Sequence, residues 1–444
     1  MKGIIFLSLF LFTEMALSAQ TLNLEMAREL ALANSRSLAR YELAIRSSIL
    51  DERNQLYSML PSVSAGYSAS VDYLKDRNFV NPVDTFTAGV TFSVTQVIFQ
   101  GGKSFIQKAI NAIATESVRK DALAEYFNVL DSADNAYYAA LESYAALEAE
   151  ESSLQAAVLA LSIAQIRRES GMINQGDYLK ALADAEAREN SRNQARRSLS
   201  LNIAKLKAMI GVDGTLELEQ IDFNSYEEVF LRLSGISDEQ ADELIVNFWD
   251  LLVTANPSLA KAALNSERAE RNLTLSIRDY SPTLTATVFS TGLNYSTAAG
   301  FNPTLQGGVT LRGSIPVDFW VMNNRIERSR IALDSARLDY INAESSLEME
   351  LGTAVLNALS QAGTVLSSRR SLEYAEKHYE YVMERYRLLQ SSVSELSDAS
   401  TLLINNRNTH IRASYAFLQS LSRLRSLCAL DDEERLINIL LGNN

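Results

Sequence analysis

The sequence contains a single cysteine, Cys428, and only two histidines among its 444 residues. One thiol cannot form an internal disulfide, and one cysteine with two histidines cannot supply a metal cluster of the usual ligand spacing. His378 and His410 are also too scattered for a Ser/His/Asp or Cys/His catalytic arrangement. We therefore predict a chain that has no metal and no cofactor, is not an enzyme, and depends on packing for its fold.

Basic side chains are in the minority, with 41 Lys and Arg against 54 Asp and Glu and a formal net charge of −13. Nucleic-acid binding requires basic patches that meet the phosphates, so this balance argues against a nucleic-acid partner. The same balance would favour cations at any narrow opening that the protein encloses.

Long apolar runs are missing beyond the start of the chain, and none approaches the roughly 20 residues that a membrane-spanning helix needs. The start itself has the layout of a secretory signal, in Lys2, the apolar run 4–12, Ala16, Ser18 and Ala19. We predict a signal peptide over 1–19, and cleavage after Ser18 and after Ala19 both remain open. An uncleaved anchor is the alternative, although the run is too short to cross a hydrocarbon core of ~30 Å. A membrane region would then have to consist of strands.

Proline is also scarce, with six residues in all and none between Pro82 and Pro257 or after Pro316. Because an interior proline costs a helix roughly 3 kcal/mol, these two stretches are free to form long helices. The stretch 103–170 has neither Gly nor Pro, so it predicts a helix of roughly 100 Å, with a shorter partner over 177–210. Helices of this length indicate coiled-coil packing, and an ordinary fibrous coiled coil is the alternative.

The sequence is internally duplicated. The segment from Asn34 to Pro61 is echoed from Asn256 to Pro282, at a spacing of about 221 residues. Further along, Arg167, Asp177, Ala181 and Leu206 fall against Arg385, Glu395, Ala399 and Leu424, at a spacing of 218. We accordingly divide the chain into the signal 1–19, a first repeat 20–211, an acidic insertion 212–243, a second repeat 244–430 and a tail 431–444.

Each repeat contains two segments in which apolar and small polar residues alternate, which is typical of strands with one apolar face. They cover 62–73, 86–95, 283–295 and 305–315, and the third changes phase, so we expect a bulge or bend there. Strands of this length can cross a membrane, but four strands cannot close a barrel. An open sheet in lipid would leave edge N–H and C=O groups unpaired, so several copies must close it together. The alternative is a soluble sheet with one dry face.

These features resemble the TolC-like outer-membrane efflux protein family, and the resemblance covers essentially the whole mature chain. It is carried by the strand starts at Leu60-Pro61 and Ser281-Pro282 and by the helix start at Phe99-Gln100-Gly101-Gly102. In the second repeat Ile315-Pro316-Val317 is followed by Asn323-Asn324 in place of the glycines, and Asn tolerates left-handed backbone.

The resemblance implies a mixed α and β fold. It is a trimeric outer-membrane β-barrel with four strands per subunit, twelve in total, continued by a long α-helical coiled-coil tunnel in the periplasm. The acidic insertion 212–243 resembles the equatorial collar of such proteins, and a solvated linker is the alternative.

In this family, paired acids at the start of the last long helix form an acidic ring around the periplasmic aperture. Glu395 and Asp398 occupy those positions, and their spacing puts both carboxylates on one helix face. Capping of the helix start by these acids is the alternative, and both roles are possible together.

The family also pairs an aspartate at the Asp177 position with a tyrosine and an arginine to hold the gate shut. Tyr386 matches the tyrosine, but Ser391 stands where the arginine is expected. We therefore predict a weaker latch, or one made from other residues.

The resemblance implies a passive exit duct for drugs, metal ions or proteins, located in the bacterial outer membrane and extending into the periplasm. Its expected partners are two further copies, outer-membrane lipid, a periplasmic adaptor protein and an inner-membrane pump of the RND or ABC type. A structural coiled-coil protein of the cell envelope without a pore is the alternative. A hydrolase using Glu395 and Asp398 would need a cleft that a long coiled coil does not provide.

Overall fold

The computed structural model describes residues 21–74, 83–296, 300–303 and 306–441. The predicted signal 1–19 and Pro82 therefore lie outside the described residues. The chain forms two compact units. Unit 1 contains residues up to Arg36, Glu125–Ala255 and the residues from Glu348 onward, and unit 2 contains Ser37–Ala124 and Asn256–Leu347.

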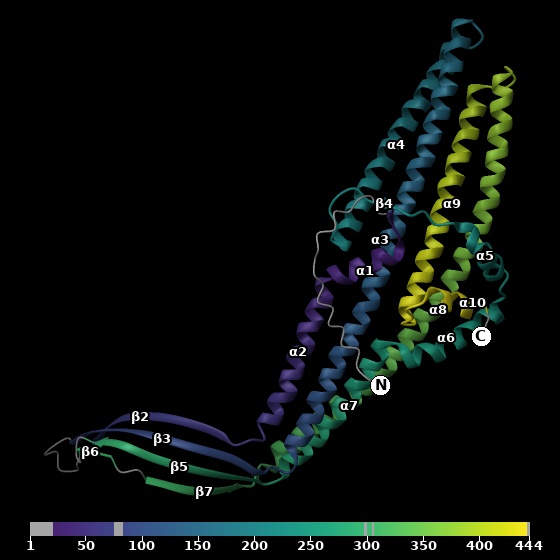
Figure 1. The fold of residues 1–444 in the computed structure, drawn as a ribbon. Coiled ribbons are helices and arrows are strands. Elements are labelled where there is room, and N and C mark those ends of the chain that lie inside the picture. Colours follow the sequence, from purple (N-terminus) through teal and green to yellow (C-terminus); the bar gives the residue numbers. More distant parts are fainter. Residues whose placement is uncertain (1–20, 75–82, 297–299, 304–305, 442–444) are drawn as a thin grey trace. The chain divides into compact units, whose positions relative to one another are not determined.

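Unit 2 contains one antiparallel sheet, drawn as a curved ribbon in Figure 1. Its strands are β2 (Ser62–Leu74), β3 (Val83–Phe99), β5 (Thr283–Ser296) and β7 (Gln306–Ser314), paired in the order β2-β3-β5-β7, while the short β6 (Gly300–Asn302) pairs with the end of β5. The helices of this unit are α2 (Arg36–Tyr57), α7 (Pro257–Ile277) and the short η2 (Arg278–Tyr280). Each repeat thus contributes two neighbouring long strands, as the alternation predicted.

The two faces of the sheet differ in chemistry. Apolar side chains on one face are exposed, including Tyr67 at 89 % and Val309 at 70 %. On the other face hydroxyl groups pair across strands, as in Ser70 with Thr87 at 2.7 Å between the oxygens. In the described part of one chain, the sheet therefore has a broad exposed apolar face.

The predicted irregularity in the third strand is present as a register shift. Val90 pairs with Gly292 but Ala88 pairs with Tyr295, so β5 has one extra residue between these pairs. The extra residue returns Tyr295 to the apolar face, where its ring centroid lies 6.0 Å from that of Phe86. Before the shift, Phe289 lies on the opposite face and contacts the position where Gly308 has no side chain.

The turn into the first long helix requires its glycine. Gly101 has φ +67°, and a Cβ atom there would lie 2.2 Å from the Cβ of Ser281. The expectation for the second repeat is wrong: Asn323 and Asn324 lie inside a helix that begins at Phe319, so they do not replace the glycines as left-handed residues. The residues between Ser314 and Phe319, with Pro316, make this turn instead.

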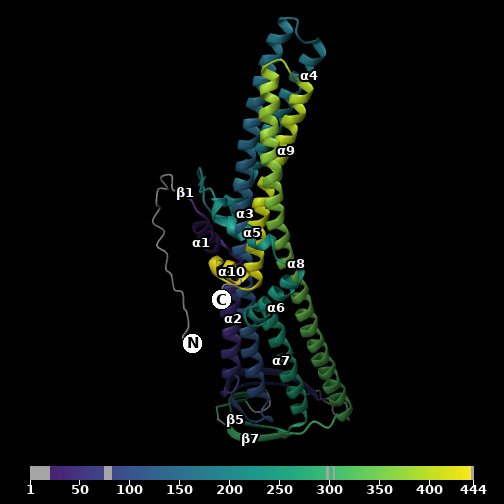
Figure 2. The ribbon, with the colours of Figure 1, turned by 90° about the vertical axis from the view of Figure 1, so that its right-hand side faces the viewer.

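Two long helices begin in unit 2 and end in unit 1, namely α3 (Lys103–Glu169, 67 residues) and α8 (Phe319–Arg387, 69 residues). Each folds back into a second helix, α4 (Gln175–Ile210) or α9 (Val393–Leu427). We call α3–α4 the first hairpin and α8–α9 the second hairpin; Figure 2 shows them side by side. None of the helices in the described part of the chain is both long and apolar enough to cross a membrane.

The remaining elements of unit 1 surround the base of these hairpins. They are β1 (Thr21–Leu22), α1 (Leu24–Asn34), β4 (Glu217–Leu218), η1 (Phe223–Tyr226), α5 (Glu227–Ser234), α6 (Asp238–Ala255) and α10 (Glu433–Leu440). The N-terminal strand is held by the hydroxyl of Tyr137, which donates to the carbonyl oxygens of Leu22 at 3.0 Å and Glu219 at 2.9 Å.

A buried ion-pair network lies at the centre of unit 1. Asp134 is fully buried and accepts two hydrogen bonds from Arg28, at 2.6 and 2.9 Å. Its second oxygen also accepts from Ser422 at 2.6 Å and from Arg425 at 2.8 Å, and Arg425 is only 1 % exposed. Glu433 lies 3.5 Å from Arg28. The network therefore joins α1, α3, α9 and α10.

Asp134→Asn should destabilise the protein strongly, because it leaves the buried Arg425 without its counter-ion and Arg28 with only the more distant Glu433. Loss of one partner from a buried ion pair costs about 3–5 kcal/mol. Thermal melting in detergent, followed by far-UV circular dichroism, would measure the effect.

Asp131→Asn is the matched control on the same helix. Burial raises the pKa of Asp131, so its charged form is already disfavoured and its neutral replacement should cost little. Equal losses of melting temperature in the two variants would contradict a special role for Asp134.

Candidate functional site

The ends of the two hairpins meet in one apolar cluster. Its buried members come from all four helices, and they are Ala164, Ala181, Val382, Met383, Tyr386, Val393, Leu396 and Ala399. Ala181 and Ala399 are equivalent in the duplication, so both repeats place a small residue at the same point of their second helix. We call this end of the hairpins the tip.

The two tip turns have the same backbone but not the same sequence. The N–H of Met172 donates to the carbonyl of Arg167, and the N–H of Gln390 donates to that of Arg385, each at 2.8 Å. The left-handed residue is Gly171, with φ 72°, in the first turn and Leu389, with φ 65°, in the second. A leucine in this conformation is strained, because its Cβ crowds the backbone.

Tyr386 and Arg167 form a clamp between the hairpins. Tyr386 is fully buried, and the Arg167 guanidinium carbon lies 3.9 Å from the centre of its ring. This is a cation–π contact. Burial raises the pKa of Tyr386, the charge of Arg167 opposes the shift, and the charge of Asp177 adds to it.

Arg167 and its equivalent Arg385 are used differently. Arg385 donates to the carbonyl of Gln390, so it stabilises its own turn at 2.8 Å. Arg167 instead crosses to the second hairpin, is only 6 % exposed, and has two nitrogens, Nε and Nη2, without a hydrogen-bond partner among the described residues. The sequence identified Arg167 only as the equivalent of Arg385 in the duplication, because its contact with Tyr386 joins residues far apart in the chain.

The predicted gate residue Asp177 lies in the first turn of α4, where Asn174 caps its N–H at 2.8 Å. Among the described residues no hydrogen bond joins its carboxylate to Tyr386. The two are coupled by charge alone, since Asp177 adds to the upward shift of the pKa of Tyr386.

The predicted aperture acids lie on the exposed face of α9. Glu395 and Asp398 are exposed, while Leu396 and Ala399 beside them are buried. Glu395 also forms a capping box: its N–H donates to the Ser392 hydroxyl at 3.1 Å and its carboxylate accepts from the Ser392 N–H at 3.4 Å. The Ser391 hydroxyl donates to the same carboxylate, and this bond and the Ser392 N–H lower the pKa of Glu395. Glu395 thus caps the start of α9 while it stays exposed.

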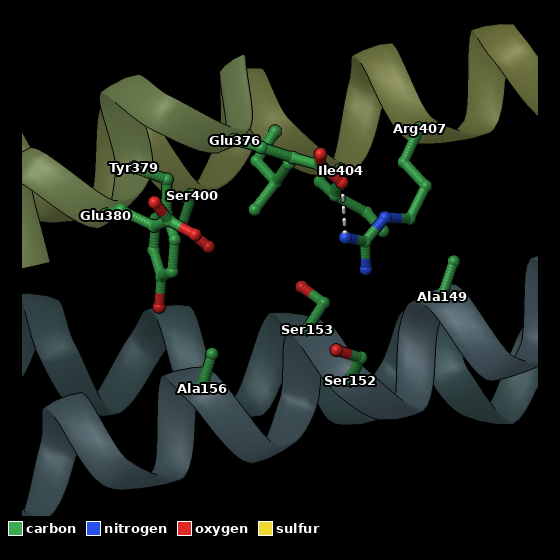
Figure 3. A pocket seen from close by; sticks show the side chains of 11 residues that line it. Ala149, Ser152, Ser153, Ala156, Glu376, Tyr379, Glu380, Ser400, Ile404 and Arg407 are labelled. Carbon is green, nitrogen blue, oxygen red and sulfur yellow. Dashed lines mark hydrogen bonds and ion pairs between the residues drawn. The ribbon is translucent and has the colours of Figure 1, made fainter. Parts of the chain in front are cut away.

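A cavity of about 400 Å³ separates the hairpins behind the tip. Figure 3 shows its small side chains from α3, including Ala156, opposite side chains from α8 and α9, with Glu376 bonded to Arg407 at 3.0 Å. In the described part of the chain, no group of three or more His, Cys, Asp and Glu side chains could hold a metal ion.

The family model for outer membrane efflux proteins matches residues 27–212 and 250–429. The chain belongs to the outer membrane efflux protein family. The model matches twice, in keeping with the internal duplication, whereas the precise domain boundaries stay a prediction. No curated protein matches the chain.

Solved structures with a similar fold include outer-membrane channels. The CmeC channel of Campylobacter jejuni is 14 % identical with a TM-score of 0.75, over 95 % of this chain and 89 % of that one. VceC of Vibrio cholerae is 14 % identical with a TM-score of 0.73, over 91 % and 96 %. The open state of the MtrE channel of Neisseria gonorrhoeae is 13 % identical with a TM-score of 0.72, over 92 % and 89 %.

These comparisons confirm the family, the outer-membrane location and the mixed fold of barrel strands and long helices with an internal duplication. The family is one of channels and not of enzymes. The aperture acids and the gate contacts stay predictions.

Leu389→Gly should stabilise the tip by about 0.5–1 kcal/mol, because glycine removes the left-handed strain at some cost in chain entropy. Hydrogen exchange of the tip amides would report the gain. The reverse change, Gly171→Leu, should destabilise the first turn by about 1 kcal/mol, although a Cβ there meets no atom within 4 Å. No difference between the two turns would show that the strain is absent in solution.

Proposed function

We propose that the protein is the outer-membrane subunit of a passive trans-periplasmic exit duct for efflux or type I secretion. The observation that carries this proposal is the four-stranded sheet, with an exposed apolar face and edge strands β2 and β7. Such a sheet is stable in lipid only if other copies pair with its edges, because an unpaired backbone group there costs several kcal/mol.

Three copies are proposed to form a barrel of twelve strands. Backbone pairing requires several copies, and the number three comes from the family resemblance. The hairpins of three copies would then form the wall of a helical tunnel, and the hydroxyl-lined face of each sheet would face the water-filled lumen.

The energy for transport is proposed to come from partners, since the sequence has no nucleotide-binding loop. An inner-membrane pump of the RND or ABC type would supply it, and a periplasmic adaptor would recruit the tip. Drugs, metal ions and proteins are all compatible cargoes for a wide duct, whose selectivity would come from the pump.

The tip is proposed as the gate of the duct. In a trimer, three copies of Glu395 and Asp398 would place six carboxylates around the aperture and concentrate cations there. The clamp of Arg167 on Tyr386 would keep the two hairpins of each copy together until a partner docks. A cation–π contact contributes about 0.5–2 kcal/mol, which is small enough to be overcome on docking.

The double change Glu395→Gln and Asp398→Asn should weaken block by multivalent cations in planar-bilayer recordings by roughly tenfold or more, because charge focusing changes local ion concentration by this order. Gln at position 395 can preserve the capping box, so charge is separated from capping. Because the pKa of Glu395 is lowered, its charge should persist as the pH falls into the ordinary carboxyl range.

Ser392→Ala is the matched control for this experiment, since it removes the cap and retains both charges. It should lower the melting temperature and leave cation block unaltered. If multivalent cations block the current through the double variant as strongly as through the unaltered protein, the two acids do not line the aperture. If no currents appear and the protein is soluble without detergent, the duct itself is wrong and a structural coiled-coil protein is favoured.

Removal of the clamp should favour the open state. Tyr386→Ala and Arg167→Ala should each raise the mean conductance, whereas Tyr386→Phe keeps the ring and should behave like the unaltered protein. The mean conductance of the double alanine variant should be little higher than that of either single variant, because each single change already removes the contact. Fully additive effects would show that the two residues act separately.

A further inference from the structure

An aromatic pocket of about 230 Å³ lies in unit 1, where the segment after β4 packs against α3 and α9. The side chains that give it its chemistry are Tyr144 and Glu148 of α3, Phe223 of η1, and His410 and Tyr415 of α9. It shares no lining residue with the cavity behind the tip. The aromatic pocket is therefore a second concave site on the molecule.

The segment after β4 is held over the pocket by a contact on each side. The carbonyl of Glu219 accepts a hydrogen bond of 2.9 Å from the hydroxyl of Tyr137 on α3. Four residues later the ring of Phe223 packs edge-on against Tyr415 of α9, with 5.2 Å between centroids and 85° between planes. The residues between these two contacts line the pocket. Its walls are thus formed without a ligand, which lowers the entropic cost of binding one.

Three of the lining side chains are aromatic. Tyr415 is only 6 % exposed, and among the described residues its hydroxyl has no hydrogen-bond partner. Tyr144 is 47 % exposed, so the pocket can be reached from solvent. Burial raises the pKa of Tyr415 to about 12, so this phenol stays neutral. The faces of such rings carry partial negative charge, and they attract cations.

The charge of the pocket is negative. Glu148 is exposed at its edge, and no Lys or Arg is found among the described residues that line it. Burial lowers the pKa of His410, and the charge of Arg369 lowers it further, so the imidazole is neutral at pH 7. Nearby, Glu142 and Arg412 lie outside the lining and oppose one another in charge. The pocket therefore combines rings with one carboxylate and no competing cation.

The equivalent positions of the other repeat have none of these features. At the spacing of 218, Tyr144, Glu148, His410 and Tyr415 correspond to Ala362, Leu366, Arg192 and Arg197. Two of the replacements are cations, which would repel a positively charged ligand. The helix packing that the two repeats share thus requires neither the rings nor the acid, and the aromatic pocket is a property of one repeat only.

We propose that the aromatic pocket binds a small organic cation with an alkylated nitrogen, such as a trimethylammonium group. The methyl groups of this cation contact ring faces without needing hydrogen bonds, whereas a primary ammonium is strongly hydrated and loses its water at a cost. The volume is below the ~300–1,000 Å³ of sites for drug-sized ligands, so the ligand is small. Glu148 balances its charge. The proposal does not depend on the duct or on the aperture acids.

Choline and its uncharged isostere 3,3-dimethylbutan-1-ol test the proposal. Each is titrated by isothermal calorimetry into the full chain in a non-ionic detergent, with sodium chloride as the blank for choline. Choline should bind saturably, and the alcohol should bind roughly tenfold more weakly, because it keeps the shape and loses the charge. Equal affinities would overturn the proposal, since the pocket would then select shape alone.

Two substitutions at exposed residues locate the binding site. Tyr144→Leu should weaken choline binding roughly fivefold, because it removes one ring face. Glu148→Gln should weaken it roughly threefold, because it removes an exposed counter-charge. Both variants should melt like the unaltered protein. Glu189→Gln is the matched control: it makes the same change in net charge at an exposed acid of α4 outside the lining, and choline affinity should stay unaltered.

The aperture variant Glu395→Gln with Asp398→Asn separates this site from the gate. It should bind choline as the unaltered protein does, because neither acid lines the aromatic pocket. Loss of choline binding in this variant, with full binding in Tyr144→Leu and Glu148→Gln, would place the cation at the aperture and overturn the pocket. The proposed duct would still stand. No choline binding to protein that melts normally would also overturn the pocket.

Discussion

The burial of one charged carboxylate determines how unit 1 is assembled. Asp134 has no access to solvent, and its charge is balanced by Arg28 of the N-terminal helix and Arg425 near the end of the last long helix. An unpaired charge at this place would cost several kcal/mol, so α1, α3 and α9 must come together for any of them to be stable there. The two hairpins extend from this common base, and the contacts at their tips depend on it.

The tip combines contacts of modest energy. The clamp of Arg167 on Tyr386 has no hydrogen bonds to the guanidinium Nε and Nη2 atoms among the described residues, and the second turn contains a strained leucine at position 389. Polar links across the hairpins, such as Lys180 to Ser394 at 2.6 Å, lie at the surface, where water competes with them. Contacts of this modest strength are compatible with the gate proposed above, which would open when a partner docks.

Several apolar surfaces of a single chain are exposed. The sheet ends in strands β2 and β7 at its edges, and its apolar face is exposed. Tyr374 and Tyr381 on α8 and Val158 on α3 are exposed as well.

Local patterns in the sequence determined where the helices and strands lie. The absence of proline from 103–170 predicted α3, and the alternation of apolar and polar residues predicted all four long strands, because helix and strand periodicities depend on near neighbours. The phase change in β5 was predictable for the same reason, whereas the glycine turn at Gly101 was expected from the family resemblance. The place of Asn323-Asn324 was not predictable in this way, since both residues are also compatible with a helix interior. The turn lies before them in the sequence, around Pro316.

Only the tertiary structure decided which distant side chains meet. The gate contact between Asp177 and Tyr386 stays a prediction, and the structure adds Arg167 as the residue that lies on the tyrosine ring. Asp134 looked like any helix-surface acid, because its partners Arg28, Ser422 and Arg425 are separated from it by 106, 288 and 291 residues. The sequence by itself thus determined the elements, the duplication and the family resemblance, which arise from local and repeated patterns. The pairing of buried charges and rings depends on how helices rotate against one another, which no local pattern contains.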